Sequence, residues 1–253
     1  MEIIEALVII QARMSSTRLP GKVLELVNGM PVIYWQIERI KKSSMNLRIV
    51  VATSNDASDD QLVNFLISKN IEVFRGSLDN VYSRFIKVAK SLKYEIIVRS
   101  TADCPLFMPD ILDEMLLDFV RSEVDYLSNT NPPTYPDGLD IEIFKFDALT
   151  SLESRDLTKM EKEHVTYGIY TRPEEFTLKN YSNKDNLSNL RWTLDYFEDL
   201  LFIRKVFKNW IGSEDKFGFE DLLVLLRENT SLHSEIEGNR RNEQLERLEN
   251  GNN

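Results

Sequence analysis

Short apolar runs alternate with longer amphipathic segments through the first half of the chain. Four of these runs have the pattern of strands buried in a parallel sheet, and they span residues 7–10, 48–52, 71–74 and 96–98. The segments that follow them are predicted to be helices, at 31–42, 58–68, 80–92 and 109–122. The second of these helices starts with Ser58 and Gln61 in the form of a capping box. Repeated strand–helix units predict an α/β fold with a mostly parallel sheet.

The second half of the chain is less regular. Strands are predicted at 126–128 and 139–144, and helices at 146–154, 159–170, 196–207 and 219–228. A turn-rich loop at 131–138 lies between the two strands and is predicted to reach over the sheet edge as a flap. We expect one three-layer α/β/α domain at 1–230, in which roughly 130–190 form a small β-containing insertion, and a polar tail at 231–253.

Composition narrows the class of protein. The 253 residues carry 31 basic and 41 acidic side chains, a formal charge of −10. This balance argues against general binding to nucleic acid or to an anionic membrane, since both need a broad basic face. The single cysteine, Cys104, excludes an intramolecular disulfide and favours a reducing compartment. An acidic N-terminus and the lack of a long apolar run predict a cytoplasmic protein without membrane segments.

Three cations, Arg13, Arg18 and Lys22, lie between the first predicted strand and the first predicted helix. In open α/β sheets ligands bind beyond the carboxyl ends of the strands, so these cations are expected to surround that edge. Arginine offers a planar fork to phosphate oxygens and lysine a compact charge, so the segment is predicted to hold a polyphosphate. A basic loop exposed to solvent is the alternative. Neither the P-loop motif nor the glycine motif of dinucleotide-binding folds follows the first strand.

Two aspartates are candidate ligands for a divalent cation. Asp103 follows the strand predicted at 96–98, and Asp195 precedes the helix predicted at 196–207, so both are expected at the same sheet edge. Mg²⁺ favours oxygen ligands and usually keeps water, so two carboxylates and phosphate oxygens would suit it. Each aspartate also has a structural alternative: Asp195 as the N-cap of the helix, and Asp103 as the cap of a turn.

An ordered set of short motifs resembles the cytidylyltransferases that activate acidic sugars, the family of the Kdo and acylneuraminate CMP-transferases. The matching segments are 9–22, 50–54, 75–81, 99–106, 138–142, 163–166 and 191–195. The resemblance spans roughly residues 7–207 and is closest to the spore coat polysaccharide SpsF-like branch. Where the Kdo enzymes carry Gln-Gly-Asp, this chain has Thr101-Ala102-Asp103, which also favours that branch.

The resemblance implies a nucleotide-diphospho-sugar transferase-like fold that binds CTP. It implies that Arg13, Lys22 and Asp103 are catalytic and that Asp103 and Asp195 bind Mg²⁺. The implied nucleotide-binding residues are Ala12, Arg13, Ser16, Arg18, Lys22, Thr53, Ser54, Arg75 and Thr101. The preference for cytosine comes from the resemblance alone, and hydroxyl groups at strand ends also have ordinary structural uses.

The acceptor side offers fewer signals. The polar candidates in or beside the matched motifs are Arg84, Asp140, Glu142, His164 and Arg191. An acidic sugar would require a cation, and arginine can bind a carboxylate through two hydrogen bonds. His164 has two possible roles: it could orient or deprotonate the acceptor hydroxyl, or it could be a structural residue. Asp140 and Glu142 share one face of an alternating strand, so they could equally be its solvated side.

These observations predict a Mg²⁺-dependent enzyme that transfers CMP from CTP to a sugar or acidic sugar for surface polysaccharide synthesis and releases pyrophosphate. The family commonly forms dimers through the inserted region, so a homodimer is expected. Two alternatives remain. A glycosyltransferase that uses a nucleotide sugar would typically carry an Asp-x-Asp pair, which is not seen at Asp103. The other alternative is a nucleotide-binding subunit without catalytic activity.

Overall fold

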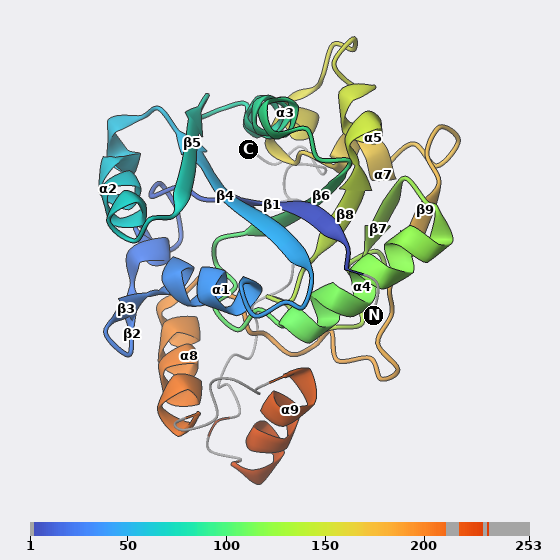
Figure 1. Cartoon of the computed structure of the whole chain (residues 1–253). Coiled ribbons are helices and arrows are strands. Elements are labelled where there is room, and N and C mark those ends of the chain that lie inside the picture. Colours follow the sequence, from blue (N-terminus) through green and yellow to red (C-terminus); the bar gives the residue numbers. More distant parts are fainter. Residues whose placement is uncertain (1–2, 211–217, 230–231, 233–253) are drawn as a thin grey trace.

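The computed structural model describes residues 3–210, 218–229 and 232, and its centre is a seven-stranded sheet (Figure 1). The strands of this sheet are β1 (Glu5–Gln11), β4 (Asn46–Ser54), β5 (Glu72–Gly76), β6 (Ile96–Thr101), β7 (Tyr126–Ser128), β8 (Glu142–Lys145) and β9 (Leu178–Asn180). Their order is β5-β4-β1-β6-β8-β7-β9. All neighbours pair in parallel except β8, which is antiparallel to β6 and β7. The predicted mostly parallel sheet is therefore confirmed.

The apolar run of β1 is explained by packing on both faces of the sheet. Ala6, Val8 and Ile10 belong to one hydrophobic cluster, and Leu7 and Ile9 belong to the other. Because side chains alternate along a strand, a strand covered on both faces needs apolar residues at successive positions. The carboxyl ends of the parallel strands emerge together from this core at one edge of the sheet.

Helices form the two outer layers (Figure 1). The first hydrophobic cluster includes α1 (Val32–Ile40), α2 (Asp60–Ser68), α4 (Pro109–Ser122), α8 (Phe197–Asn209) and α9 (Phe219–Glu228). The second cluster includes α3 (Val81–Leu92), α5 (Phe146–Thr150) and α7 (Tyr167–Tyr170), and α6 (Lys159–Glu163) lies beside α3. This arrangement is the predicted three-layer α/β/α architecture.

The strand predicted at 139–144 is wrong in its first half, because β8 begins only at Glu142. Before it, the side chain of Asn129 replaces strand pairing: its Nδ2 donates to Leu139 O (2.7 Å) and its Oδ1 accepts from Ile141 N (2.9 Å). Asp140 therefore lies in a loop while Glu142 lies in the strand. The alternative that these two acids form the solvated face of a strand is therefore wrong, and Glu142 is buried.

Two predicted helices are shorter than expected. The helix predicted at 146–154 ends as α5 at Thr150, and the helix predicted at 159–170 is divided into α6 and α7. His164 separates these two, with φ −103° and ψ 74°, which is outside the helical region. Just beyond it, Val165 is fully buried and the Thr166 hydroxyl donates to Glu142. Tertiary contacts therefore override helical continuity here.

The predicted capping box at Ser58 is also wrong. Asp56 accepts from Ser58 N (2.9 Å) and caps a short 3₁₀ helix, η2 (Ala57–Asp59), before α2 begins at Asp60. The local reason is that Asp59, at the end of η2, directs its carboxylate away from α2 and toward the end of β4.

A small hairpin of β2 (Leu26–Val27) and β3 (Met30–Pro31) precedes α1 and was not predicted. Asn28 and Gly29 form its turn with φ 45° and 79°. The Asn-Gly pair is a known signal for such a turn, so the sequence did contain the information. The predicted tail at 231–253 lies outside the described residues, apart from Leu232. Within the described ranges, no helix has the length and apolar character needed to cross a membrane.

Candidate active site

The basic loop after β1 is held in a defined shape by its own backbone. Gly21 N donates to Met14 O (2.9 Å), which closes the loop on itself. Gly21 has φ 74°, a conformation that suits glycine. Met14 N donates to Asp59 Oδ1 (2.7 Å), which ties the loop to η2. The chain then enters a 3₁₀ helix, η1 (Lys22–Leu24).

This loop surrounds a cavity of about 160 Å³, which we call the loop cavity. Most of the predicted phosphate-side residues line it: Ala12, Arg13, Ser16, Arg18, Lys22, Thr101 and Asp103. The first five come from the loop, and the last two come from the end of β6 and the turn beyond it. The structure thus brings the cations and Asp103 to one place at the carboxyl edge of the sheet.

Lys22 is the central charge of this region. Its Nζ donates to Asp103 Oδ2 (2.5 Å) and to Asp195 Oδ1 (2.8 Å), which lie 81 and 173 positions further along the chain. Burial alone would raise the pKa of Asp103, but the charge and hydrogen bond of Lys22 outweigh it and lower that pKa to about 2. Burial alone would likewise lower the pKa of Lys22, and the two aspartates raise it instead. Asp103 and Lys22 are therefore both ionised at neutral pH.

Asp195 does not act as the N-cap of α8. The residue before α8 is Tyr196, and the backbone N–H groups of Asp195 and Tyr196 donate to Asp199 Oδ2 (2.7 and 2.8 Å). The Asp195 carboxylate instead contacts Lys22, Arg18 (2.5 Å) and Arg191 (2.7 Å). The N-cap alternative for Asp195 is therefore wrong: the N-cap is Tyr196, and Asp199, at the third position of α8, accepts from its backbone N–H.

Arg191, predicted to bind the acceptor, lies behind Asp195. Its guanidinium also contacts Asp137 (2.7 Å) and Asp199 (3.1 Å). Burial alone would lower its pKa, but hydrogen bonding to Asp199 and the surrounding acids raise it. Arg191 does not line either cavity of the site. Its visible contacts are those of a residue that fixes the position of Asp195.

A second and larger cavity of about 360 Å³ opens beside the first, and we call it the wide cavity. The two cavities share Gln11, Arg18, Thr101, Asp103 and His164 along their common edge. They therefore form one continuous depression with the charged cluster between its two parts. The predicted flap segment at 131–138 contributes Asn131, Asp137 and Gly138 to the wall of the wide cavity.

Three predicted acceptor residues, Asp140, Glu142 and His164, line the wide cavity. Glu142 is buried, and it accepts hydrogen bonds from Tyr126 (2.7 Å), Thr166 and Arg99. His164 has a buried Nε2 without a hydrogen-bond partner in the described part of the chain. Burial first, and the nearby Arg99 charge second, lower the pKa of His164, so its imidazole is neutral at pH 7.

Besides Arg191, four predicted site residues do not reach either cavity. Thr53 and Ser54 are fully buried, and their hydroxyls donate to Asp59 Oδ2 (2.8 and 2.5 Å). Arg75 contacts Asp60 and backbone carbonyls at the end of β4 (2.7 to 2.9 Å). Arg84 is 2% exposed in α3, and burial lowers its pKa to about 10. Its Nε and Nη1 have no hydrogen-bond partner within the described residues.

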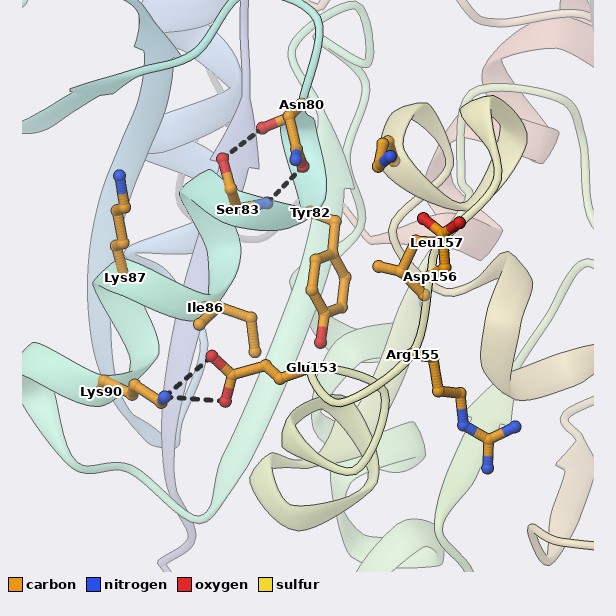
Figure 2. Close-up of a pocket in the computed structure, with 11 residues that line it drawn as sticks. Asn80, Tyr82, Ser83, Ile86, Lys87, Lys90, Glu153, Arg155, Asp156 and Leu157 are labelled. Atoms are coloured by element: carbon orange, nitrogen blue, oxygen red, sulfur yellow. Dashed lines mark hydrogen bonds and ion pairs between the residues drawn. The ribbon is translucent and has the colours of Figure 1, made fainter.

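Another hollow, of about 390 Å³, lies between α3 and the segment 153–162 (Figure 2). Figure 2 shows Lys90 paired with Glu153, and Asn80, the N-cap of α3, bonded to Ser83 in the first turn of that helix. Its lining includes none of the predicted site residues. The depression at the carboxyl edge of the sheet is therefore the candidate active site.

Several residues of this site were not singled out by sequence reasoning. Gln11 and Arg99 lie in the wall, and Asp59 and Asp199 hold the loop and Asp195 from behind. Arg99 stands inside a matched motif, which is a signal that could have been used. Asp59 and Asp199 carried no such signal, because an acid near a helix start is ordinary.

Comparison with known proteins assigns the family. A family model described as Cytidylyltransferase matches residues 7–250. The chain belongs to the cytidylyltransferase family. The spore coat polysaccharide biosynthesis protein SpsF of Bacillus subtilis is 30% identical over 240 residues, which are 92% of this chain and 98% of that protein. The predicted resemblance to this family and to its SpsF-like branch is therefore confirmed.

Solved structures agree with this assignment. The structure of a cytidylyltransferase from Leptospira borgpetersenii is 31% identical, with a TM-score of 0.86, and the match covers 93% of this chain and 99% of that one. A CMP:2-keto-3-deoxy-manno-octonic acid synthetase complexed with CTP is 15% identical, with a TM-score of 0.63 over 82% of this chain and 100% of that one. The second match shows a shared fold only.

Proposed function

We propose that this cytidylyltransferase transfers CMP from CTP to a sugar or sugar-acid acceptor, releases pyrophosphate and serves surface glycan synthesis. The observation that carries the proposal is the position of the Lys22 ammonium between Asp103 and Asp195, where the two cavities meet. The loop cavity would take the triphosphate and the wide cavity the acceptor. Membership of the family and the relationship to SpsF support this assignment.

Each loop cation has a proposed part in the reaction. Arg13, Arg18 and Lys22 would bind triphosphate oxygens, and Arg18 and Lys22 would exchange aspartate oxygens for phosphate oxygens as the nucleotide enters. An acceptor hydroxyl oxygen attacks the α-phosphorus, and the bond from that phosphorus to the bridging oxygen of pyrophosphate breaks. The hydroxyl proton passes to a neighbouring base, for which we propose the neutral His164. The cations stabilise the charge on the departing pyrophosphate.

Asp103 and Asp195 are proposed to hold Mg²⁺. Their oxygens already share one cation, the Lys22 ammonium, and carboxylate oxygens are the ligands that Mg²⁺ prefers. Across the described residues no group of three or more His, Cys, Asp or Glu is placed to bind a metal, so phosphate oxygens and water would complete the shell. Bound there, the ion would neutralise phosphate charge and orient the α-phosphate. The predicted homodimer and cytoplasmic location belong to the same proposal.

Measuring pyrophosphate release tests the proposal directly. Purified protein is incubated with Mg²⁺, each nucleoside triphosphate in turn and a panel of neutral and acidic sugars. We expect release with CTP and at least one acceptor, and loss of that release in Asp103→Ala. Asp147→Ala, an exposed aspartate in α5, is the matched control. Full turnover by Asp103→Ala, or release that is independent of CTP, would refute the assignment.

A further inference from the structure

Arg99 lies in the wall of the wide cavity with its guanidinium fixed from two sides. It belongs to β6, in the middle of the sheet, and its side chain is 12% exposed. Its Nε donates to Gln11 Oε1 (3.0 Å) on β1, and its Nη1 donates to Glu142 Oε2 on β8. Both anchoring residues come from strands adjacent to β6, so the guanidinium is held by the rigid core of the sheet.

The third nitrogen of this guanidinium has a different environment. Nη2 makes no hydrogen bond within the described part of the chain, yet it is not among the buried polar atoms that lack a partner there. Nη2 is therefore accessible, and the accessible space beside Arg99 is the wide cavity. A guanidinium carries five N–H donors, and the two on Nη2 are not used by the described part of the chain.

Glu142 accepts three hydrogen bonds from the protein itself. Its Oε1 accepts from the hydroxyls of Tyr126 and Thr166, and its Oε2 accepts from Arg99. Burial alone would raise the pKa of Glu142, but Arg99 and the two hydroxyls lower it, so the carboxylate stays ionised. Glu142 is therefore suited to orient Arg99, with little remaining capacity to bind an acceptor.

Three other acids that line the wide cavity, Asp103, Asp137 and Asp195, are engaged by cations other than Arg99. Asp103 and Asp195 share Lys22, and Asp137 pairs with Arg191. A buried cation with an open edge favours a ligand oxygen that carries negative charge, because charge-assisted hydrogen bonds are stronger than neutral ones. A planar carboxylate matches the planar donor edge.

We propose that Arg99 selects the acceptor by donating from Nη2 to an acceptor carboxylate, while Gln11 and Glu142 act as positioning residues for its guanidinium. This inference rests on the proposed cytidylyl transfer and adds the recognition group for the acceptor. Glu142, which was predicted to bind the acceptor, instead positions the Arg99 guanidinium in this proposal.

Paired probes separate charge recognition from simple structural support. The probes are 3-deoxy-manno-octulosonate, N-acetylneuraminate and glucuronate, each compared with its neutral methyl ester, and pyrophosphate release is measured with CTP. For Arg99→Gln we expect the KM of the carboxylate to rise about tenfold to a hundredfold, the value of one charge-assisted hydrogen bond. The KM of CTP and the KM of the ester should change by less than about twofold.

A double variant keeps the test valid if the single variant folds poorly. Arg99→Gln leaves Glu142 buried and unpaired, whereas Arg99→Gln with Glu142→Gln leaves a neutral pair. If Arg99 served only to pair with Glu142, the double variant would recover the wild-type KM for the carboxylate, and this recovery would overturn the proposal. A persistent rise in that KM, in a protein with the wild-type melting temperature, supports it. Arg48→Gln, in an exposed Arg–Glu pair near the start of β4, is the matched control.

The wild-type protein distinguishes failure of this inference from failure of the proposed function. If it binds CTP in a calorimeter and turns over only the neutral esters, the carboxylate assignment is overturned and cytidylyl transfer stands. If it binds no CTP and releases no pyrophosphate with any probe, the proposed function fails and the assignment of Arg99 fails with it.

Discussion

Replacing Lys22 with methionine tests whether a buried ammonium holds the two aspartates together. Methionine keeps much of the length and apolar packing of lysine, but it removes the charge and the hydrogen bonds to Asp103 and Asp195. Asp195 retains its contacts with Arg18 and Arg191. Asp103 loses the only ion pair that it makes among the described residues. The substitution therefore acts mainly on Asp103.

The pKa of Asp103 sets the expected magnitude. It is lowered from an ordinary value of 3.8 to about 2, although burial alone would raise it. At roughly 1 to 2 kcal/mol for each pKa unit, this difference corresponds to about 2 to 3 kcal/mol of stability. The Asp103 side chain is only 19% exposed, so solvent screens little of this contribution. We expect Lys22→Met to lower the free energy of unfolding at pH 7 by about 2 to 3 kcal/mol.

The pH dependence gives the sharper test. A carboxyl group with a lowered pKa in the folded state stabilises the protein fully above its unfolded pKa of about 4, and this stability is lost as the pH falls toward 2. In Lys22→Met, burial raises the pKa of Asp103 and only the weaker hydrogen bonds, such as that with Thr101, oppose it, so the folded variant takes up a proton more readily. The difference in unfolding free energy between wild type and variant should therefore shrink as the pH falls from 7 to about 4.

Urea unfolding followed by tryptophan fluorescence, at several pH values from 7.5 to 3.5, measures this difference. Lys87→Met, at an exposed position in α3, is the control and should change stability by less than about 0.5 kcal/mol. A Lys22→Met variant as stable as wild type at pH 7 would refute the reasoning. So would a loss of stability that stays constant down to pH 4.

Three further predictions concern the same site. Asp59→Asn removes a carboxylate that accepts from Met14 N and from the Thr53 hydroxyl. The free energy of unfolding should therefore fall by about 2 kcal/mol, and the KM of CTP should rise. An unchanged KM in pyrophosphate-release kinetics would contradict this. Gly138→Ala would place a methyl group 2.5 Å from Thr193 N, at a residue whose φ is 103°. Calorimetry should therefore show that the free energy of unfolding falls by at least about 2 kcal/mol. An unchanged melting temperature would count against this prediction. Removing divalent cations with EDTA should stop pyrophosphate release, and added Mg²⁺ should restore it; activity that persists in EDTA would exclude the proposed metal site.

Much of the fold was predictable because helices cover both faces of the sheet. The run from Ala6 to Ile10 is apolar at every position, and the structure buries it on both faces. The predicted elements failed where a single long-range contact decides the backbone. Asn129 replaces strand pairing before β8, and the burial of Val165 interrupts the helix predicted at 159–170. Such contacts leave no periodic signal in the sequence.

The candidate site was also predictable only in part. Arg13, Arg18 and Lys22 follow one strand, and Asp103 follows another, so the rule for the carboxyl ends of parallel strands was enough to expect them together. Thr53 and Ser54 stand at the end of β4, yet their hydroxyls turn to Asp59. The direction of a side chain at a strand end depends on the partner behind it, which strand position does not specify.

Local residue order by itself determined the alternation of strands and helices, the basic loop after the first strand and the family motifs. These are properties of neighbouring residues, and hydrophobic periodicity and residue type carry them directly. Only the tertiary structure decided that one lysine bridges Asp103 and Asp195, that Asp199 accepts from the backbone of Asp195, and that Glu142 accepts from Arg99. Those assignments depend on which charges the folded chain places within hydrogen-bonding distance, and a buried charge takes the partner that the packing of distant strands brings to it.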